Sequence, residues 1–170
     1  YVNSLIERHR FNAITKVNIE VLLTSWEVGE YISIQLKTSR WGSKVVSELA
    51  DYLKLQNPQR RGFGKRHLYN MVKFYDLYSR VEFSEMIKIL HLSEIVQLRI
   101  AQLGYIEKDR RPLKSSITLL AIPELLLLIP FTSHLEIMNR CNTDEERIFY
   151  MIYASQQSLK TEELRRCIVN

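Results

Sequence analysis

The chain of 170 residues has few of the residues that break helices, with only five glycines and four prolines. An all-β sandwich or barrel needs frequent turns and uses Gly and Pro to make them, so this scarcity argues against such a fold. The two cysteines, Cys141 and Cys167, are too few for a disulfide framework and lack Cys-x-x-Cys spacing. We expect them to be the reduced thiols of a cytoplasmic protein.

A long hydrophobic run is also missing. The most apolar stretch, residues 117–131, is shorter than the roughly 20 residues of a transmembrane helix and is interrupted by Pro123 and Glu124. We therefore expect no membrane partner and predict a buried helix that begins near Pro123. Because the run is apolar nearly all round, a homodimer interface through residues 117–131 is the alternative.

The motifs of common catalytic and cofactor sites are absent. The sequence has no phosphate-binding loop, no Gly-x-Gly-x-x-Gly fingerprint and no Gly-x-Ser-x-Gly elbow, and its four histidines lack metal-ligand spacing. His67 and His134 could act as general bases, although a lone histidine is more often a cap or a core hydrogen-bonding group. We predict no catalytic residue, metal, cofactor or small-molecule substrate, so the chain by itself is not expected to be an enzyme.

Long periodic segments, typical of an all-α protein, make up most of the chain. Apolar residues recur at helical spacing over residues 2–37, which predicts one long helix or two in line. Gly29 lies one turn after Trp26, and we interpret it as a point of close helix packing. Ser43 is a candidate cap of a second helix that stops before Pro58. The predicted buried stripe of that helix is Val45, Val46, Leu49, Tyr52 and Leu53.

Shorter helices are predicted toward the C-terminus, over residues 82–103 and 133–140. Thr143 precedes three consecutive acids, the pattern of a capped helix start, and a last helix begins near Thr161. The predicted buried residues of these helices are Phe83, Met86, Ile87, Leu90, Ile148, Met151, Ile152, Ser155, Leu164 and Ile168. We expect a single domain over residues 1–170, in which residues 1–80 precede a C-terminal helical subdomain over 81–170.

The net charge of +5 is unevenly distributed. Between Tyr52 and Tyr75 there are six cations and no acid, and residues 40–80 have nine basic against three acidic residues, a balance of +6. The rest of the chain is therefore nearly neutral, at −1. A local excess of this kind favours an anionic partner.

At the centre of this excess, a basic turn with two glycines leads into a helix whose faces differ. The spacing of a buried stripe is found at Leu68, Met71, Val72 and Tyr75. The opposite face carries cations, an amide and a phenol, which suit phosphates and base edges. An ordinary solvated face is the alternative. The predicted nucleic-acid-binding residues are Arg60, Arg61, Lys65, Arg66, Tyr69, Asn70 and Lys73.

Residues 42–78 thus predict a helix, a turn of about eight residues and a basic second helix. This resembles a helix-turn-helix with an extended turn, in which the second helix would enter a groove of DNA. RNA is the alternative ligand. The expected fold is all-α, with this helix-turn-helix-like centre packed against a long N-terminal helix and a C-terminal helical subdomain.

Several stretches together resemble a known family. They are Trp26-x-x-Gly29-x-x-Ile32, Trp41-Gly42-x-Lys44-Val45-Val46-x-x-Leu49-Ala50-x-x-Leu53, Gly62-Phe63-Gly64-x-x-x-Leu68-Tyr69-x-Met71-x-x-Phe74-Tyr75, Ile129-Pro130-Phe131-x-x-His134 and Arg147-x-Phe149-Tyr150-x-x-Tyr153-Ala154. This pattern is similar to the N-terminal domain of the YhcG family, bacterial proteins that carry a PDDEXK-type nuclease domain after it.

The resemblance leaves out residues 80–120 and includes three departures. The family usually has Ser at the position of Gly64, Asn at that of His67 and Trp at that of Phe131. The resemblance implies a helical module that helps an attached nuclease find or hold nucleic acid, or that pairs subunits as an oligomer. The catalytic residues of the nuclease domain have no counterparts in this sequence.

Overall fold

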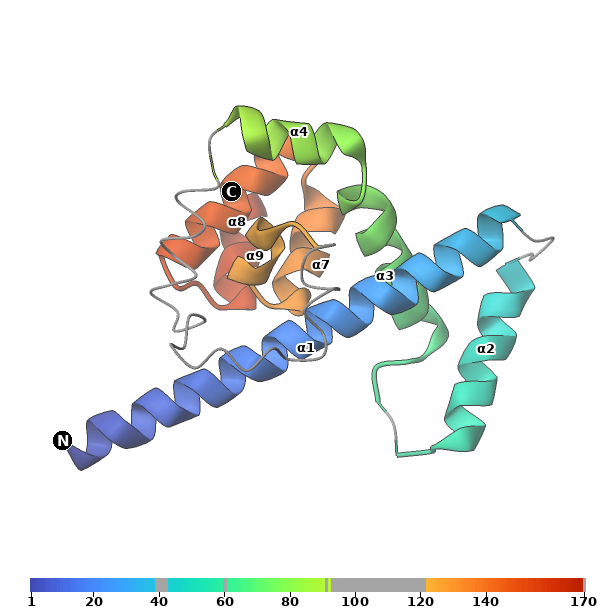
Figure 1. Ribbon diagram of the computed structural model, residues 1–170, viewed down its shortest axis with the longest axis horizontal. Helices are drawn as coiled ribbons and strands as arrows, with labels where there is room; N and C mark the ends of the chain where they lie inside the picture. Colours follow the sequence, from blue (N-terminus) through green and yellow to red (C-terminus); the bar gives the residue numbers. More distant parts are fainter. Residues whose placement is uncertain (39–42, 60, 91, 93–121, 170) are drawn as a thin grey trace. The chain divides into compact units, whose positions relative to one another are not determined.

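The computed structural model describes residues 1–38, 43–59, 61–90, 92 and 122–169 (Figure 1). These residues form seven α-helices and one 3-10 helix and contain no β-strand, which confirms the all-α prediction. They belong to two compact units, Thr24–Arg80 and a second unit that combines Tyr1–Leu23 with Val81–Asn170. The predicted turn near Trp41, the helix expected beyond Leu92 and the charged residue Arg60 lie outside the described residues.

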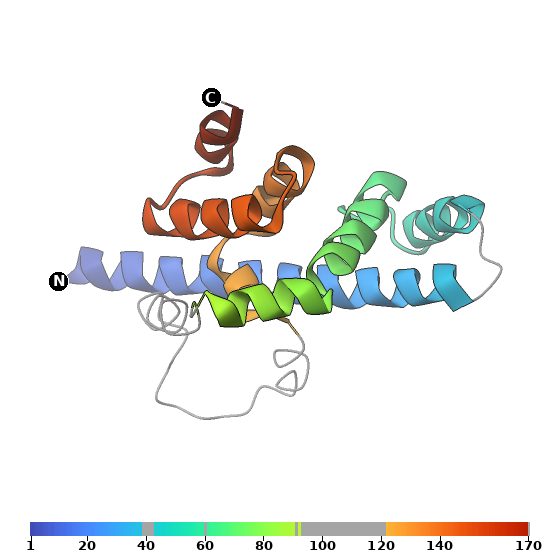
Figure 2. The same cartoon turned by 90° about the horizontal axis from the view of Figure 1, so that it is seen from above.

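Helix α1 (Val2–Thr38) is one helix of 37 residues, the first of the two alternatives that its periodicity left open. Figure 2 shows the helical ribbon of α1 from above. Its apolar residues do not share one face, because Leu22 and Trp26 are buried whereas Ile14 and Val17 are exposed. Helix formation was therefore predicted correctly over the whole segment, but burial applies only to part of it.

In the unit Thr24–Arg80, α1 and α3 (Lys65–Tyr78) touch backbone to backbone at Gly29. A Cβ atom at this position would lie 2.1 Å from the carbonyl oxygen of Met71, so no residue with a side chain fits without a shift. The indole of Trp26 packs edge-on against Phe74 and Tyr75, with ring centroids 6.0 and 5.0 Å apart. The prediction that Gly29 marks close packing of two helices is confirmed.

Polar contacts reinforce the same pair of helices. The Ser33 hydroxyl and the Lys37 ammonium both donate to Asp76 Oδ1, at 2.6 and 2.7 Å. The Tyr75 hydroxyl donates to Glu30 Oε1 at 3.1 Å. Tyr75, predicted to be buried, is only half-buried, since its ring lies against Trp26 while its hydroxyl reaches a surface carboxylate. The inner face of α3 is therefore fixed by both apolar and polar contacts.

Helix α2 (Ser43–Gln56) packs against α3, and the eight residues 57–64 join the two. Val46 and Ala50, one turn apart, are the buried residues of α2. Tyr52 was predicted to be buried but is 57% exposed, because two residues beyond Ala50 the side chain has turned to the far side of the helix. The helix ends before Pro58, as predicted.

The other unit contains α4 (Val81–Ile89), the 3-10 helix η1 (Glu124–Leu128), α7 (Phe131–Arg140), α8 (Asp144–Gln156) and α9 (Thr161–Val169). Helices α7, α8 and α9 pack against one another, and η1 packs against α8. Leu90, predicted to be buried, is 48% exposed because it follows the last residue of α4. The fully buried residues include Phe83, Leu125, Leu126, Ile137, Met151 and Leu164.

The helix predicted to begin near Pro123 is only the five-residue η1. Ile129 follows it in an extended conformation (φ −136°, ψ 155°), because the residue before a proline is disfavoured in the α region. Pro130 then acts as the N-cap of α7. The leucines of η1 are buried within the chain itself, and residues 117–121 lie outside the described residues. A homodimer through this run stays a prediction.

Candidate functional site

Four cations of the predicted site form what we call the basic surface: Arg61, Lys65, Arg66 and Lys73, all exposed. Arg61 lies in the loop before α3, and the other three project from α3 itself. The buried residues of α3 are Leu68, Met71, Val72, Phe74 and Tyr78. Tyr69 and Asn70 are half-buried at the edge of the outer face. The outer face of α3 therefore carries Arg66, Tyr69, Asn70 and Lys73 together, whereas Arg60 lies outside the described residues.

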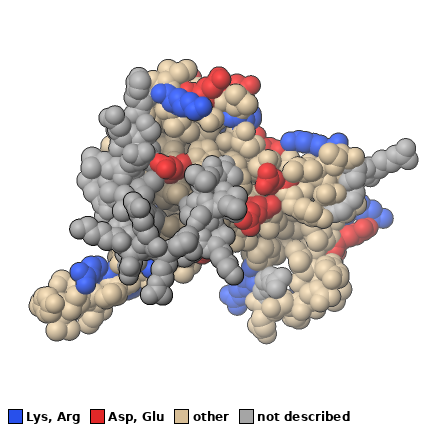
Figure 3. All heavy atoms as spheres, in the orientation of Figure 1, with Lys and Arg blue, Asp and Glu red and all other residues tan. Residues whose placement is uncertain are grey.

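Within the described part of the chain, acidic side chains do not neutralise the loop before α3 or the first turn of α3. Among the described residues, no carboxylate lies within ion-pair distance of Arg61, Lys65 or Arg66. Asp76, the acid of α3, is engaged with Ser33 and Lys37 on the inner side. In the view of Figure 3, the Lys and Arg side chains form separate groups with acids between several of them. The positive excess counted over residues 40–80 therefore includes this loop and the first turn of α3.

The N-terminus of α3 has no side-chain cap. Gly64 is the N-cap residue, in an extended conformation with φ −72° and ψ 164°, and only its carbonyl takes part, accepting from the N–H of Leu68 at 3.1 Å. The first turn contains Lys65, Arg66 and His67 and no acid. Free N–H groups and the positive end of the helix dipole therefore coincide with the two cations Lys65 and Arg66. Upstream, Gly62 has φ +87°, which favours glycine at this turn.

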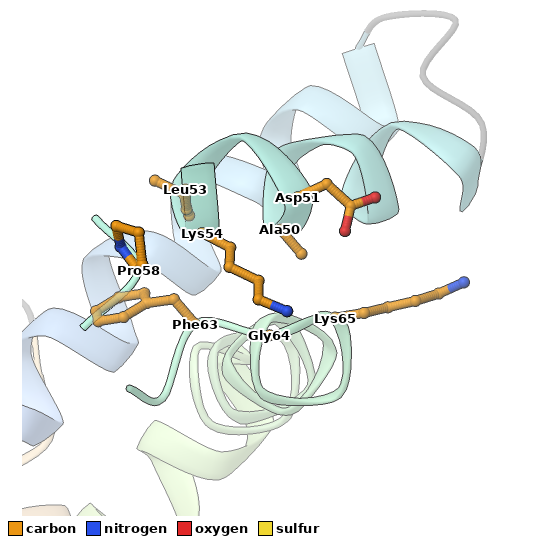
Figure 4. A pocket seen from close by; sticks show the side chains of 8 residues that line it. All are labelled: Ala50, Asp51, Leu53, Lys54, Pro58, Phe63, Gly64 and Lys65. Atoms are coloured by element: carbon orange, nitrogen blue, oxygen red, sulfur yellow. The ribbon is translucent and has the colours of Figure 1, made fainter. Parts of the chain in front are cut away.

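A groove of about 350 Å³ lies between the end of α2 and the start of α3 (Figure 4). In Figure 4 the Lys54 side chain extends from α2 toward Gly64, whereas Lys65 points away from the groove. Lys54 was counted in the charge excess but not in the predicted site, because helical spacing cannot bring α2 beside the start of α3. The groove is lined by Ala50, Asp51, Leu53, Lys54, Pro58, Phe63, Gly64 and Lys65.

The two histidines considered as general bases differ in their surroundings. His67 is exposed in the first turn of α3. His134 is fully buried, and its Nε2 lies 2.8 Å from the carbonyl oxygen of Leu126, so it has the core hydrogen-bonding role. Burial lowers its pKa to about 4, against the smaller opposing effect of that hydrogen bond.

Other titratable groups also point to structural roles. Burial raises the pKa of the Cys141 thiol, and the charge of Glu146 acts in the same direction, which makes the reactive thiolate scarcer. Within the described ranges, no three His, Cys, Asp or Glu side chains gather as a metal ion would require. In the same part of the chain, every helix is too short or too polar to cross a membrane.

Comparison with known proteins places the chain in a family. The family model described as the DUF1016 N-terminal domain matches residues 1–170. Comparisons with curated proteins and with solved structures gave no match. The matching model is that of the family's N-terminal domain and not that of a nuclease domain, in agreement with the resemblance found from the sequence. The chain therefore belongs to the YhcG (DUF1016) family and corresponds to its N-terminal domain.

Proposed function

We propose that this chain is a nucleic-acid-binding module, with duplex DNA as its ligand, that positions a PDDEXK-type nuclease domain attached to it. The observation that carries the proposal is the basic surface. Its cations are exposed, Arg61, Lys65 and Arg66 have no acidic partner among the described residues, and the surface ends at an N-terminus without a side-chain cap. Such an arrangement costs stability by itself and becomes favourable when an anion is bound.

The opposite face of α3 supports the same role. Gly29, Trp26 and the Asp76 contacts hold this face against α1, so the outer side chains project from a rigid element. A binding site on a rigid element keeps its geometry without an entropic cost of ordering. Arg61 and Lys65 would contact phosphates at the start of α3.

Further along the outer face, side chains suited to bases follow. Arg66, Asn70 and Lys73 would lie in or across the groove, with Tyr69 at its edge. Arg and Asn form bidentate hydrogen bonds with guanine and adenine edges, whereas Lys is a point charge for phosphate. Phosphate contacts position the helix, and the two planar side chains supply any sequence preference.

The nuclease-positioning part of the proposal rests on the family. Proteins of the YhcG family carry a nuclease domain after this one, and a module that binds DNA by itself would raise the local concentration of substrate at that domain. The module need not contribute a catalytic group.

Binding of short labelled duplex DNA across a salt series tests the proposal. The double variant Arg61→Ala with Lys65→Ala should bind all sequences more weakly and reduce the slope of log K against log salt by about 0.9 for each lost phosphate contact. The control, Lys160→Ala with Arg166→Ala, removes the same charge from exposed positions in and before α9. Equal effects of the two double variants, or none, would refute the basic surface as the DNA contact.

The same assay separates the alternatives. An unlabelled RNA duplex that competes as well as DNA would shift the ligand class to RNA. No binding at low salt, together with a dimer on sizing, would leave α3 with an ordinary solvated face and make the chain a pairing module.

A further inference from the structure

The groove between the end of α2 and the start of α3 has a shape that the open basic surface lacks. Its volume of about 350 Å³ lies at the lower end of the roughly 300–1,000 Å³ that small-molecule sites occupy. In Figure 4, α2 forms one wall of the groove, and the loop before α3 with the first residues of α3 forms the other. The groove therefore suits a ligand of the size of a single nucleotide.

The lining of the groove is apolar at one end. In the view of Figure 4, Pro58 and Phe63 lie at this end and Asp51 at the opposite end, with Lys54 between them. Phe63 is half-buried and lines the groove with an aromatic ring, a group on which the flat face of a nucleobase can stack. The apolar lining residues are Ala50, Leu53, Pro58 and Phe63.

Two charged side chains of α2 line the same groove without pairing with each other. Asp51 and Lys54 are exposed and lie three residues apart, a spacing at which helical side chains can form an ion pair. Among the described residues, neither has an ion-pair partner. The groove thus offers a ligand both a cation and an anion.

This combination narrows the chemistry of the ligand. The apolar end suits a flat, weakly polar group, and Lys54 suits an anion. Asp51 suits a hydrogen-bond donor and disfavours a ligand that is only anionic, such as an acidic peptide or inorganic phosphate. A nucleotide has all three parts, because its base has flat faces, its phosphate is an anion, and its amino or hydroxyl groups are donors.

The position of the groove indicates the source of the nucleotide. Lys65 lines the groove and also belongs to the basic surface, so a DNA strand bound to that surface would pass beside the groove. A paired base cannot enter, because its neighbours cover its faces and its partner covers its edge. An unpaired base enters without the cost of leaving a duplex.

We propose that the groove binds an unpaired nucleotide of the DNA that is held on the basic surface. Its base packs against Phe63 and Pro58, its phosphate contacts Lys54, and Asp51 accepts a hydrogen bond from one of its amino or hydroxyl groups. This inference rests on the proposed function and adds to it a preference for DNA with an unpaired end over a fully paired duplex.

Three short duplexes of the same paired sequence test this preference by equilibrium binding. The first has blunt ends, the second has an unpaired abasic residue at one end, and the third has an ordinary unpaired nucleotide there. Affinity should rise from the first duplex to the second, because the added phosphate contacts Lys54. It should rise again by about fivefold or more from the second to the third, because only the third has a base that can stack.

Two substitutions assign these two gains in affinity to the groove. Lys54→Met keeps the apolar stem without the charge and should remove the gain from the blunt to the abasic duplex. Phe63→Leu keeps an apolar wall without the ring and should reduce the gain from the abasic residue to the base. Lys44→Met is the matched control, because Lys44 is an exposed lysine of α2 that does not line the groove, and it should leave both gains unchanged. Circular dichroism verifies folding, and the exposed Lys54 keeps the test available if Phe63→Leu is unfolded.

The outcomes distinguish this inference from the proposed function. A blunt duplex that binds as tightly as the other two overturns the groove and leaves the basic surface as the DNA contact, whereas no binding of any duplex at low salt refutes both. Equal effects of Lys54→Met and Lys44→Met also overturn the groove. A free deoxynucleoside monophosphate that binds as tightly as the third duplex overturns the assignment to DNA.

Discussion

Helices α3 and α8 are nearly equal in length, with 14 and 13 residues, but their N-termini differ in almost every respect. Helix α8 begins with a complete capping box, in which Thr143 Oγ1 accepts from the N–H of Glu146 and the Glu146 carboxylate accepts from the N–H of Thr143. Its first turn contains three acids, which complement the helix dipole. Helix α3 begins at a glycine without a side-chain cap, and its first turn is basic.

The comparison shows which helix start has its polar groups satisfied by the chain itself and which does not. In α8, Arg147 also donates to the carbonyl of Cys141 at 2.8 Å and pairs with Asp144, so the helix start is satisfied from within the chain. The start of α3 leaves N–H groups and the cations Lys65 and Arg66 without a partner from the described part of the chain, so that they are open to water or to an external anion. We therefore assign a structural role to α8, whereas ligand contact at α3 is our proposal.

The largest expected effect on stability comes from placing a side chain at Gly29, where α1 packs against α3. Gly29→Leu should destabilise the unit Thr24–Arg80 by about 4 kcal/mol or more, because its Cβ would meet the Met71 carbonyl, whose backbone cannot move aside cheaply. The gain of about 1 kcal/mol from replacing a helical glycine is too small to compensate. Hydrogen exchange measured by mass spectrometry would show the loss of protection in this unit.

The control for this substitution is Glu27→Ala, which changes an exposed position of the same helix and should be nearly neutral. Protection that stays high in α2 and α3 after Gly29→Leu would contradict the close packing of α1 on α3.

The next largest expected effect is a loss of stability at low pH in the unit that contains His134. The buried His134 has a folded pKa of about 4, below the ordinary value of 6.5, so the unfolded chain binds the proton more readily. The stability associated with neutral His134 is complete above pH 6.5 and is lost as pH falls toward 4, by roughly 3 kcal/mol. Thermal unfolding measured across this range should show the decline in the unit that contains α7 and α8.

His134→Gln removes the titrating group and should flatten the pH dependence, even if the variant is less stable at neutral pH. His67→Gln, at an exposed position in the other unit, is the control substitution and should leave the unfolding of the unit that contains α7 and α8 unchanged. An unchanged decline in His134→Gln would assign the pH effect to other groups.

Much of the fold could be predicted because its signals are local. The helical character of residues 2–37, the end of α2 before Pro58 and the cap at Thr143 depend on neighbours in sequence, and all three predictions are confirmed. Burial could be predicted less well, since it depends on which elements cover a face. Ile14 and Val17 have helical spacing and yet are exposed, because an apolar stripe does not reveal whether anything packs on it.

In the candidate site, too, the local features could be predicted and the features that depend on packing could not. The outer face of α3 followed from helical spacing, and the structure brings Arg66, Asn70 and Lys73 together there. Lys54 could not be assigned to the start of α3, because its position there depends on how α2 packs. The length of η1 was equally hard to predict, since a run of leucines suits a longer helix until Pro130 forces Ile129 to be extended.

A moderate effect is expected from removing the cap of α8. Thr143→Ala leaves the N–H of Glu146 without its acceptor and should cost about 1 kcal/mol of unfolding free energy. Thr143→Ser keeps the hydroxyl and should behave like the wild type. Denaturant unfolding of the two variants measures the difference, and equal midpoints would show that the capping box contributes little.

The smallest expected change in stability comes from giving α3 a side-chain cap. This change also tests the comparison between the N-termini of α3 and α8 most directly. A Cβ at Gly64 meets no atom within 4 Å, and its φ of −72° suits any residue, so Gly64→Ser should stabilise the chain by about a few tenths of a kcal/mol. Gly62→Ser is the opposite control, because its φ of +87° should make the same change destabilising. Gly64→Asp adds a negative charge at the helix start, where we propose that phosphate binds, and should stabilise the free protein while weakening DNA binding. Tighter binding of DNA by Gly64→Asp would show that the phosphates bind elsewhere. Higher stability together with weaker DNA binding is the expected result, and it would show that the uncapped N-terminus of α3 is part of the binding site.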